Sequence, residues 1–311
     1  MDYKGLYDIH KYFLLVAKVF GKVRLRKLQV YFNKKGHKRL KKELMEKYIE
    51  KAIKKIYAAG SSNSNKKIEN KKIIWICWWQ GIDEAPSLIK ACVRSVRKTS
   101  RYEVKLIDKN NYKKYSKIDE EIENKFASGI IPLIHFSDIL RFNILMNNGG
   151  IWIDASVFMN KDFPTEYFKK DIITRKDKFE NYYNNPSGRK WSTYFFGGQK
   201  GEPIFEFLNE SYSEYWSKGN YLKDYFLTDY FLSIAYDLNI ANFKTLINEL
   251  DFNNLYMNDL DKMLNDKYNH EKFVNLMQHT NTYIFKLIYK KKLNEKTSNG
   301  EQTFYSRLMD L

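Results

Sequence analysis

A strand–helix–strand pattern between residues 73 and 107 constrains the fold of this chain more than any other feature. The apolar run "IIWIC" predicts a buried strand, "APSLIKACVRSVRK" predicts a helix with a proline near its start, and "YEVKLID" predicts a second, alternating strand. Two strands joined by a helix are typical of a βαβ unit, whose strands lie parallel in one sheet. The sequence therefore predicts the α/β class.

The stretch "HFSDILRFNILMNNGGIWIDAS" predicts a helix followed by another strand of this sheet. We expect the helix at residues 137–147, with Ser137 as its N-cap, Asp138 in its first turn and "NNGG" as its stop. The run "IWI" at residues 151–153 predicts the strand. Asp154 then stands at the carboxyl end of that strand, where open α/β sheets bind ligands.

Three charged residues in this stretch are candidates for a binding site. Asp138 and Arg141 are one helical turn apart, which fits an ordinary intrahelical ion pair. However, the helix around them is apolar on nearly all sides, and a buried ion pair rarely stabilises a fold better than hydrocarbon does. Asp154 follows two glycines that let a ligand or a backbone approach closely, although Asp154 or Ser156 could instead cap a turn.

Changes in composition divide the chain into four parts. Residues 1–60 are predicted to form an extension of basic amphipathic helices, and residues 61–72 a small, polar linker. Residues 73–290 are predicted to be the main domain, which also holds the predicted strand "STYFFGG" and two aromatic-rich helices at residues 202–218 and 223–237. Residues 291–311 are predicted to be a basic tail.

The positive charge of the chain is concentrated at its N-terminal end. The formal net charge is +17, and residues 1–57 alone hold 17 Lys and Arg against five Asp and Glu. Such an excess fits nucleic acid, an anionic membrane surface, or solubility with no partner at all.

The sequence also suggests a compartment. No stretch approaches the roughly 20 apolar residues that span a bilayer, and the N-terminus does not read as a signal peptide. Cys77 and Cys92 match no metal or redox spacing, so we expect no disulfide and a reducing compartment. We therefore expect a cytoplasmic protein.

The motif S-D-x-x-R followed by G-G-x-W-x-D-x-S resembles the signature of the capsular polysaccharide synthesis glycosyltransferases, within the DXD-type sugar transferases. The likeness runs from about residue 71 to 290 and leaves the N-terminal helices outside. Further stretches support it, namely "IWICWWQGIDEAP", "ACVRSVRK", "YEVKLIDKNNYKKY" and "KDYFLTDYF". The resemblance implies a GT-A fold, a Rossmann-like nucleotide-binding sheet, and transfer of a sugar from a nucleotide donor with retention of configuration.

The resemblance also implies roles for individual residues. Asp138 and Arg141 would hold the donor sugar and its diphosphate, Asp154 would bind the metal, the ribose or both, and Gly150 would belong to the donor site. Trp75, in the opening strand, would lie near the nucleotide base. A carboxylate accepts sugar hydroxyls, and a guanidinium supplies donors and fixed positive charge to a diphosphate leaving group.

A divalent cation, Mn²⁺ or Mg²⁺, is expected at this site. Asp154 and Ser156 occupy the DXD-like positions, but a neutral hydroxyl is a weaker ligand than a second carboxylate. The resemblance implies a further histidine ligand shortly before a lysine, and "HTNTYIFKLIYK" offers His279 with Lys286. Ordinary packing would equally explain His279, and lysines would then replace the metal.

Asp224 and Asp229 are the candidates for the acceptor side or for the back face of the donor sugar. Retention needs either a carboxylate nucleophile or front-face attack in which the leaving phosphate takes the acceptor's proton. Both acids fit an ordinary helix surface as well.

These inferences lead to one expected function and two competing ones. We expect a bacterial enzyme that adds one hexose from UDP-galactose or UDP-glucose to a lipid-linked oligosaccharide, with the basic helices at the inner face of the cell membrane. The competing functions are a basic nucleic-acid-binding protein and a non-catalytic sugar-nucleotide binder.

Overall fold

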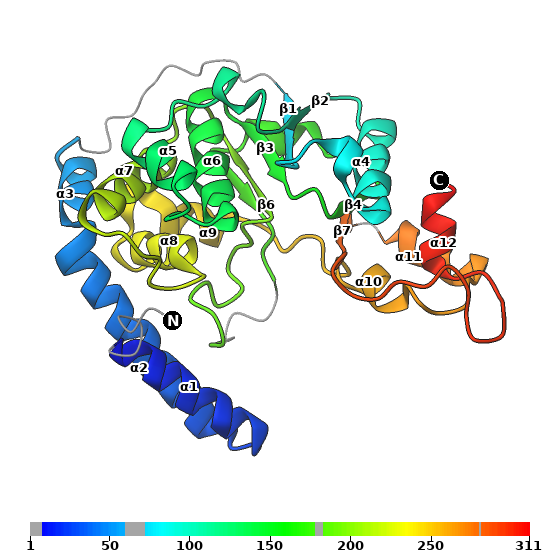
Figure 1. Ribbon diagram of the computed structural model, residues 1–311, viewed down its shortest axis with the longest axis horizontal. Coiled ribbons are helices and arrows are strands. Elements are labelled where there is room, and N and C mark those ends of the chain that lie inside the picture. The colour runs from blue at the N-terminus through cyan, green and yellow to red at the C-terminus, as the bar shows by residue number, and fades with distance from the viewer. Residues whose placement is uncertain (1–7, 60–71, 178–182, 280) are drawn as a thin grey trace.

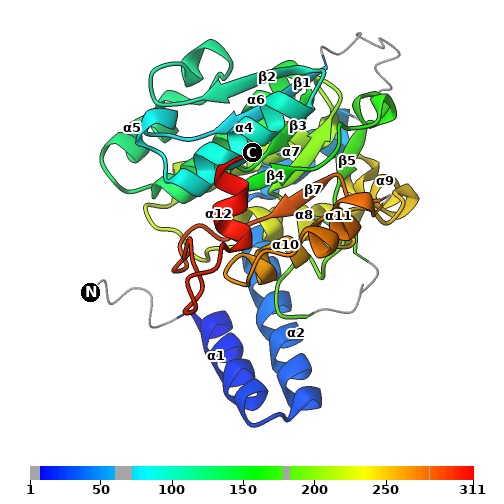
Figure 2. The same ribbon diagram turned by 90° about the vertical axis from the view of Figure 1, so that its right-hand side faces the viewer.

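The computed structural model describes residues 8–59, 72–177, 183–279 and 281–311. A central mixed sheet lies between helices on both of its sides (Figures 1 and 2). The linker predicted at residues 61–72 falls, except for Lys72, outside the described residues. Within the described part of the chain, no helix is both long and apolar enough to cross a membrane.

Five strands form the central sheet. Their order across the sheet is β2 (Glu103–Ile107), β1 (Ile73–Cys77), β3 (Gly150–Ile153), β6 (Phe195–Gly198) and β5 (Ile172–Thr174). Strand β1 pairs parallel with both β2 and β3, whereas β6 runs antiparallel to β3 and to β5. The predicted βαβ unit and its parallel pairing are therefore confirmed, and the mixed α/β architecture is compatible with a Rossmann-like fold.

Helices cover this sheet on two sides. Helix α4 (Ser87–Thr99), which links β1 to β2, lies on one side, and α6 (Leu133–Asn148), α7 (Pro203–Lys218) and α8 (Leu227–Leu238) lie on the other (Figures 1 and 2). Their apolar side chains and the buried strand residues form one large core. Covering both faces of the sheet explains why its central strands are apolar along their whole length.

A second, two-stranded sheet connects distant parts of the chain. Directly after β3, the chain turns into β4 (Val157–Met159), which pairs antiparallel with β7 (Ile284–Lys286). Short helices surround it, namely α10 (Asp259–Met263), α11 (His270–Gln278) and α12 (Phe304–Met309). Phe304 and Leu308 are buried, so the segment predicted as a basic tail packs its last helix against the domain.

The N-terminal helices form a hairpin that projects from the domain (Figures 1 and 2). Helices α1 (Ile9–Lys22) and α2 (Arg26–Glu43) pack against one another, as Phe20 stacks on Phe32 with 5.4 Å between ring centroids. A π-helical turn at Leu44–Tyr48 follows, and α3 (Glu50–Ala59) then packs on α7. The helices predicted in this region are thus confirmed.

Two local predictions need correction. Helix α6 starts at Leu133, directly after the extended Pro132, so Ser137 lies inside the helix and Asp138 in its second turn. Proline suits the start of a helix because it has no backbone N–H to satisfy. Helix α8 starts only at Leu227, because the carboxylate of Asp224 accepts a hydrogen bond of 2.8 Å from the backbone N–H of Phe226 and holds a turn there.

The double glycine at residues 149–150 allows the backbone of β3 to pack closely against β1. Gly150 has a φ of 95°, and a Cβ built on it would lie 2.6 Å from the carbonyl oxygen of Ile73. The indole Nε1 of Trp75 donates a hydrogen bond of 2.8 Å to the carbonyl of Gly149, and Trp75 itself is buried. The close approach of a backbone, one of the two explanations given by the sequence, is therefore confirmed.

We predict that Gly150→Ala destabilises the fold by at least about 2 kcal/mol more than Gly129→Ala does. Both glycines have positive φ, 95° and 78°, but a Cβ on Gly129 would meet no atom within 4 Å. The positive φ alone costs an alanine roughly 1–2 kcal/mol, and only Gly150 adds a collision with backbone. Urea unfolding of both variants measures the difference, and equal losses would contradict the role given to Gly150.

Candidate active site

A cavity of about 480 Å³ opens where β1 and β3 end. Its walls come from the turns after these strands, from α6, from the start of α8, and from β7 and the residues that follow it. The charged residues that line it are Asp138, Arg141, Asp154, Asp229, Lys286 and Lys290. Strand ends meet at one edge of a parallel sheet, so this position is the expected one for a ligand site in an α/β fold.

Arg141 holds the two nearest carboxylates together. Its guanidinium donates through Nη1 to Asp138 at 2.7 Å and through Nη2 to Asp154 at 3.0 Å, and its side chain is only 6% exposed. The guanidinium also lies over the ring of Trp152, 5.2 Å from the centroid. Because guanidinium is a planar fork that stays charged, one buried side chain fixes both acids of the motif.

Lys286 reaches the other side of Asp154. Its Nζ donates to the second oxygen of Asp154 at 2.8 Å and to the hydroxyl of Ser156 at 2.7 Å. Strand pairing explains this position, since Lys286 stands opposite Val157 in the register of β4 and β7. The short β4 strand, which follows Ser156 directly, therefore brings a lysine from far along the chain to the DXD-like segment.

The surroundings move the pKa values of these carboxylates apart. Burial alone would raise the pKa of Asp154, but Lys286 and Arg141 outweigh it and hold that pKa well below its ordinary value. Burial raises the pKa of Asp138, with Arg141 opposing the shift. For Asp229, burial raises the pKa to about 7, although Trp191 donates a hydrogen bond of 2.9 Å to it.

The first turn of α8 closes the wall next to Asp138. The hydroxyl of Thr228 donates to Asp138 at 3.2 Å and lies 2.8 Å from the hydroxyl of Tyr212. Asp229 is the next residue, and it lines the same cavity. Acids with a lowered and a raised pKa thus share one wall, an arrangement found where a site needs both a fixed anion and a proton carrier.

The structure brings most of the predicted site residues together. Asp138, Arg141, Asp154, Ser156, Asp229 and Lys286 all line the cavity. Trp75 and Gly150 do not, because they pack β3 against β1. Asp224 lines a neighbouring cavity.

The predicted metal ligands are not assembled in one place. His279 follows α11 and stacks on the ring of Tyr256, with 3.8 Å between centroids, outside the cavity. The oxygens of Asp154 and Ser156 that would face a cation both accept hydrogen bonds from Lys286. In this arrangement the ammonium of Lys286 occupies both oxygens, and His279 does not join Asp154 and Ser156 in the predicted ligand set.

Aromatic residues line the cavity beside the charged ones. Trp78 and Tyr194 line it, and Tyr225 and Phe226 form its rim, where Tyr225 is 61% exposed. The "WW" pair at residues 78–79 marks Trp78 in the sequence as a surface for a sugar ring. No role was predicted for Tyr194, Tyr225 and Phe226, which lie in turns whose positions depend on the rest of the fold.

A second cavity of about 360 Å³ adjoins the first. Tyr225 and Phe226 line both, so these two rings form the ridge between them. The hairpin provides another wall, which carries the amides Gln29 and Asn33, and Asn184 and Tyr230 of the domain line the cavity as well. Asp224 lies on this side of the ridge and Asp229 on the other.

Comparison with known proteins identifies one similarity. The model of a family described as capsular polysaccharide synthesis protein matches residues 26–308. The match is wider than the motif resemblance at residues 71–290, since it includes α2 and α3. No curated protein matches the chain.

We predict opposite pH behaviour for two acids of the cavity. Asp229 has a folded-state pKa of about 7, so the native state keeps a proton that the unfolded chain releases near pH 4. This contribution to stability is present below about pH 4 and is lost as the pH rises to about 7. Asp229→Asn should therefore gain stability relative to the native sequence across that window.

Asp154→Asn serves as the control for this prediction. The pKa of Asp154 is lowered on folding, so its contribution is complete above about pH 4 and is lost only as the pH falls below that value. Its stability difference from the native sequence should stay constant between pH 4 and 8 in denaturant titrations. A constant difference for Asp229→Asn as well would refute the raised pKa.

Proposed function

The chain belongs to the capsular polysaccharide synthesis family, and from this premise we propose that it is a retaining glycosyltransferase of GT-A fold. Its proposed reaction moves a hexose from UDP-galactose or UDP-glucose to a lipid-linked oligosaccharide. The membership supports a role in capsule biosynthesis, and the donor, the acceptor and the retaining course are our proposal.

The observation that carries this proposal is the shared arrangement of Asp138, Arg141, Asp154 and Lys286 on one cavity wall. Carboxylates accept the hydroxyls of a sugar, and charged hydrogen bonds of this kind are among the strongest in proteins. Arg141 and Lys286 place two cations where a diphosphate leaving group gathers negative charge. Lys290 adds a third cation at the cavity wall.

The donor would engage this wall by exchanging partners. In this structure, Lys286 donates hydrogen bonds to Asp154 and Ser156. When a donor binds, the ammonium group of Lys286 would break these two bonds and contact the diphosphate instead. Asp154, with its lowered pKa, stays ionised and accepts from hydroxyls of the ribose or the hexose. Arg141 keeps its geometry throughout, because Asp138 holds it from the opposite side.

Two routes to retention use the carboxylates differently. In the first, Asp138 or Asp229 attacks the anomeric carbon and the bond to the diphosphate breaks. The acceptor hydroxyl later displaces the carboxylate from the sugar and gives its proton to the released diphosphate. In the second, the acceptor attacks on the side of the leaving group, whose phosphate oxygen takes the hydroxyl proton. Mass spectrometry of a glycosylated peptide separates the routes, because only the first forms one.

A metal ion is not part of either route as proposed here. The expected Mn²⁺ or Mg²⁺ stays a prediction, since Lys286 occupies the oxygens of Asp154 and Ser156 and His279 lies elsewhere. Assays with and without Mn²⁺ test it directly.

The acceptor is proposed to enter from the second cavity. Exposed aromatic rings and amides are groups that suit a sugar, since rings cover its apolar face and amides pair with its hydroxyls. Tyr225 and Phe226 on the ridge supply the rings, and the partly exposed Gln29 beyond it supplies an amide. Asp224 is then an acceptor-side residue, and Asp229 faces the donor.

We predict that the protein releases UDP from UDP-glucose or UDP-galactose, and that Asp154→Asn lowers this release at least a hundredfold. We expect this loss because the substitution removes the negative charge of Asp154, which positions both Arg141 and Lys286. Coupled detection of UDP, run across UDP-hexoses and their N-acetyl forms, provides the measurement.

The control variant is Asp83→Asn, an exposed acid outside the cavity, which should keep full activity. A native protein that binds UDP yet releases none from any donor would be a non-catalytic sugar-nucleotide binder. Tight, salt-dependent binding of nucleic acid that survives Asp154→Asn would instead favour the nucleic-acid-binding function.

A further inference from the structure

Helix α1 exposes an apolar stripe along its outer face. Ile9, Tyr12, Leu15 and Val19 are 52%, 65%, 61% and 54% exposed, and Val23 continues the line at 58%. Their spacing of three and four residues places them on one side of the helix. Isolated exposed apolar residues are common, but a row of five along one helix is a contiguous patch.

The stripe is not needed to hold the hairpin together. The inner face of α1 provides that contact, since Phe13 and Phe20 both pack on Phe32 of α2 and Leu14 lies against Gly36. Helix α1 is therefore apolar on two opposite faces, and among the described residues only the inner one is covered.

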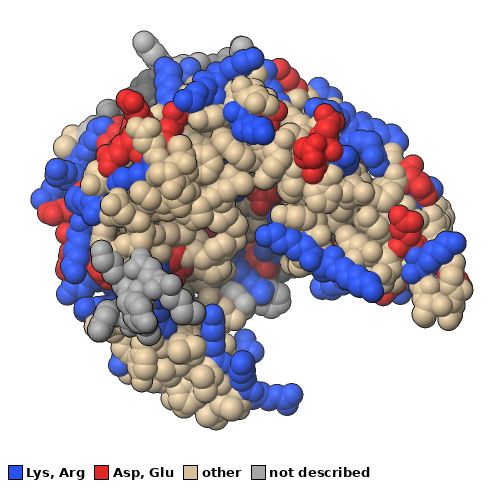
Figure 3. Space-filling view, in the orientation of Figure 1, with Lys and Arg blue, Asp and Glu red and all other residues tan. Residues whose placement is uncertain are grey.

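Basic residues surround the stripe without a single acid. Residues 9–42 hold twelve Lys and Arg and no Asp or Glu. Four of the twelve, Lys22, Arg24, Arg26 and Lys27, are exposed at the tip of the hairpin. Figure 3 shows Lys and Arg and no acidic side chain at the projecting end of the hairpin on the face in view.

We propose that the outer face of α1 and the basic hairpin tip form a docking surface for an anionic lipid membrane. The apolar stripe would enter the interface while the surrounding ammonium and guanidinium groups contact acidic headgroups. A second copy of the chain suits this face poorly, because it would bring two uncompensated basic surfaces together. The inference does not depend on the proposed sugar transfer.

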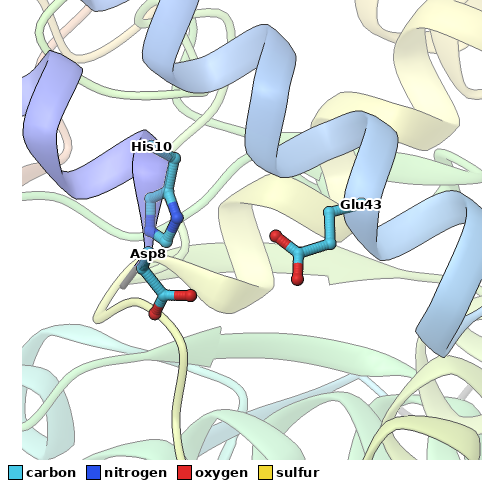
Figure 4. A group of neighbouring side chains, drawn as sticks. All are labelled: Asp8, His10 and Glu43. Atoms are coloured by element: carbon cyan, nitrogen blue, oxygen red, sulfur yellow. The ribbon is translucent and has the colours of Figure 1, made fainter. Parts of the chain in front are cut away.

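A buried ion cluster ties this surface to the domain. The Nζ of Lys223 lies 2.9 Å from Glu43 of α2 and 3.2 Å from Asp8, and it is nearly inaccessible to solvent. Figure 4 shows Asp8 and His10 at the start of α1 facing Glu43. These three side chains could hold a metal ion, but the ammonium of Lys223 already supplies the positive charge between the two carboxylates.

This connection gives membrane docking a consequence for the site. Lys223 precedes by two residues the ridge of Tyr225 and Phe226, which lines both cavities. Figure 3 shows that the molecule is hollowed between the hairpin and its C-terminal part. A hairpin held on a membrane would therefore be tied, through Lys223, to the segment that forms the ridge between the two cavities.

Vesicle flotation of the full chain tests the proposal. Vesicles of phosphatidylcholine with 30% phosphatidylglycerol are compared with pure phosphatidylcholine at about 50 and 300 mM salt. We expect binding to the anionic vesicles that weakens with salt. Lys22→Gln/Arg24→Gln/Lys27→Gln should reduce it about a hundredfold, because each basic residue near the surface contributes about a factor of five.

The apolar stripe is tested separately. Tyr12→Ser/Leu15→Ser/Val19→Ser should reduce binding at least tenfold at low salt and remove the fraction that persists at high salt. Matched controls are Lys51→Gln/Lys54→Gln/Lys113→Gln and Leu238→Ser/Phe252→Ser, which change exposed residues elsewhere and should bind normally.

Two outcomes would overturn the proposal. One is unchanged binding in both the charge and the stripe variants. The other is no vesicle binding together with a dimer, seen by light scattering, that the stripe variant dissociates. Unfolding temperatures verify that the variants fold. UDP release from a soluble donor does not need the membrane, so this assay distinguishes a failure of the docking surface from a failure of the proposed function.

Discussion

The guanidinium of Arg141 is the interaction on which the rest of the site depends. It joins Asp138 of α6 to Asp154 after β3, and Asp154 in turn holds Lys286 of β7. Helix α6, the turn after β3 and strand β7 are thereby connected through the buried guanidinium of Arg141 and its partner Asp154. Removing one partner from such a network leaves an uncompensated charge, which costs about 3–5 kcal/mol, so the network fixes the geometry of the cavity more firmly than any single contact.

The sequence predicted this centre because its parts are close in the chain. The spacing of Asp138 and Arg141 and the place of Asp154 after an apolar strand are local patterns, and local patterns translate directly into helix and strand geometry. Lys286 was reachable only through the family resemblance, since its approach depends on the pairing of β4 with β7. The assignment of Trp75 and Gly150 to the donor site stays a prediction, although both residues pack β3 against β1 and do not line the cavity. Close packing of two backbones and close approach of a ligand favour the same residue types, so the sequence could not separate the two.

Turns and terminal elements lay beyond prediction for a different reason. Tyr225 and Phe226 belong to a turn held by Asp224, and nothing in their spacing reports which cavity they face. On α1, periodicity correctly predicted a helix, but it could not show that one apolar face packs on α2 while the other stays exposed. Helix α12 is too short to leave a periodic signal.

The pairing of β4 with β7 sets the order in which a growing chain can complete its site. Asp154 and Lys286 are 132 residues apart in sequence. During synthesis, α6 and β3 leave the ribosome long before β7, so a nascent chain carries the Asp138–Arg141–Asp154 arrangement without its lysine. An unfinished chain thus lacks the contacts of Lys286 to Asp154 and Ser156, and this side of the cavity is completed only when synthesis is nearly finished.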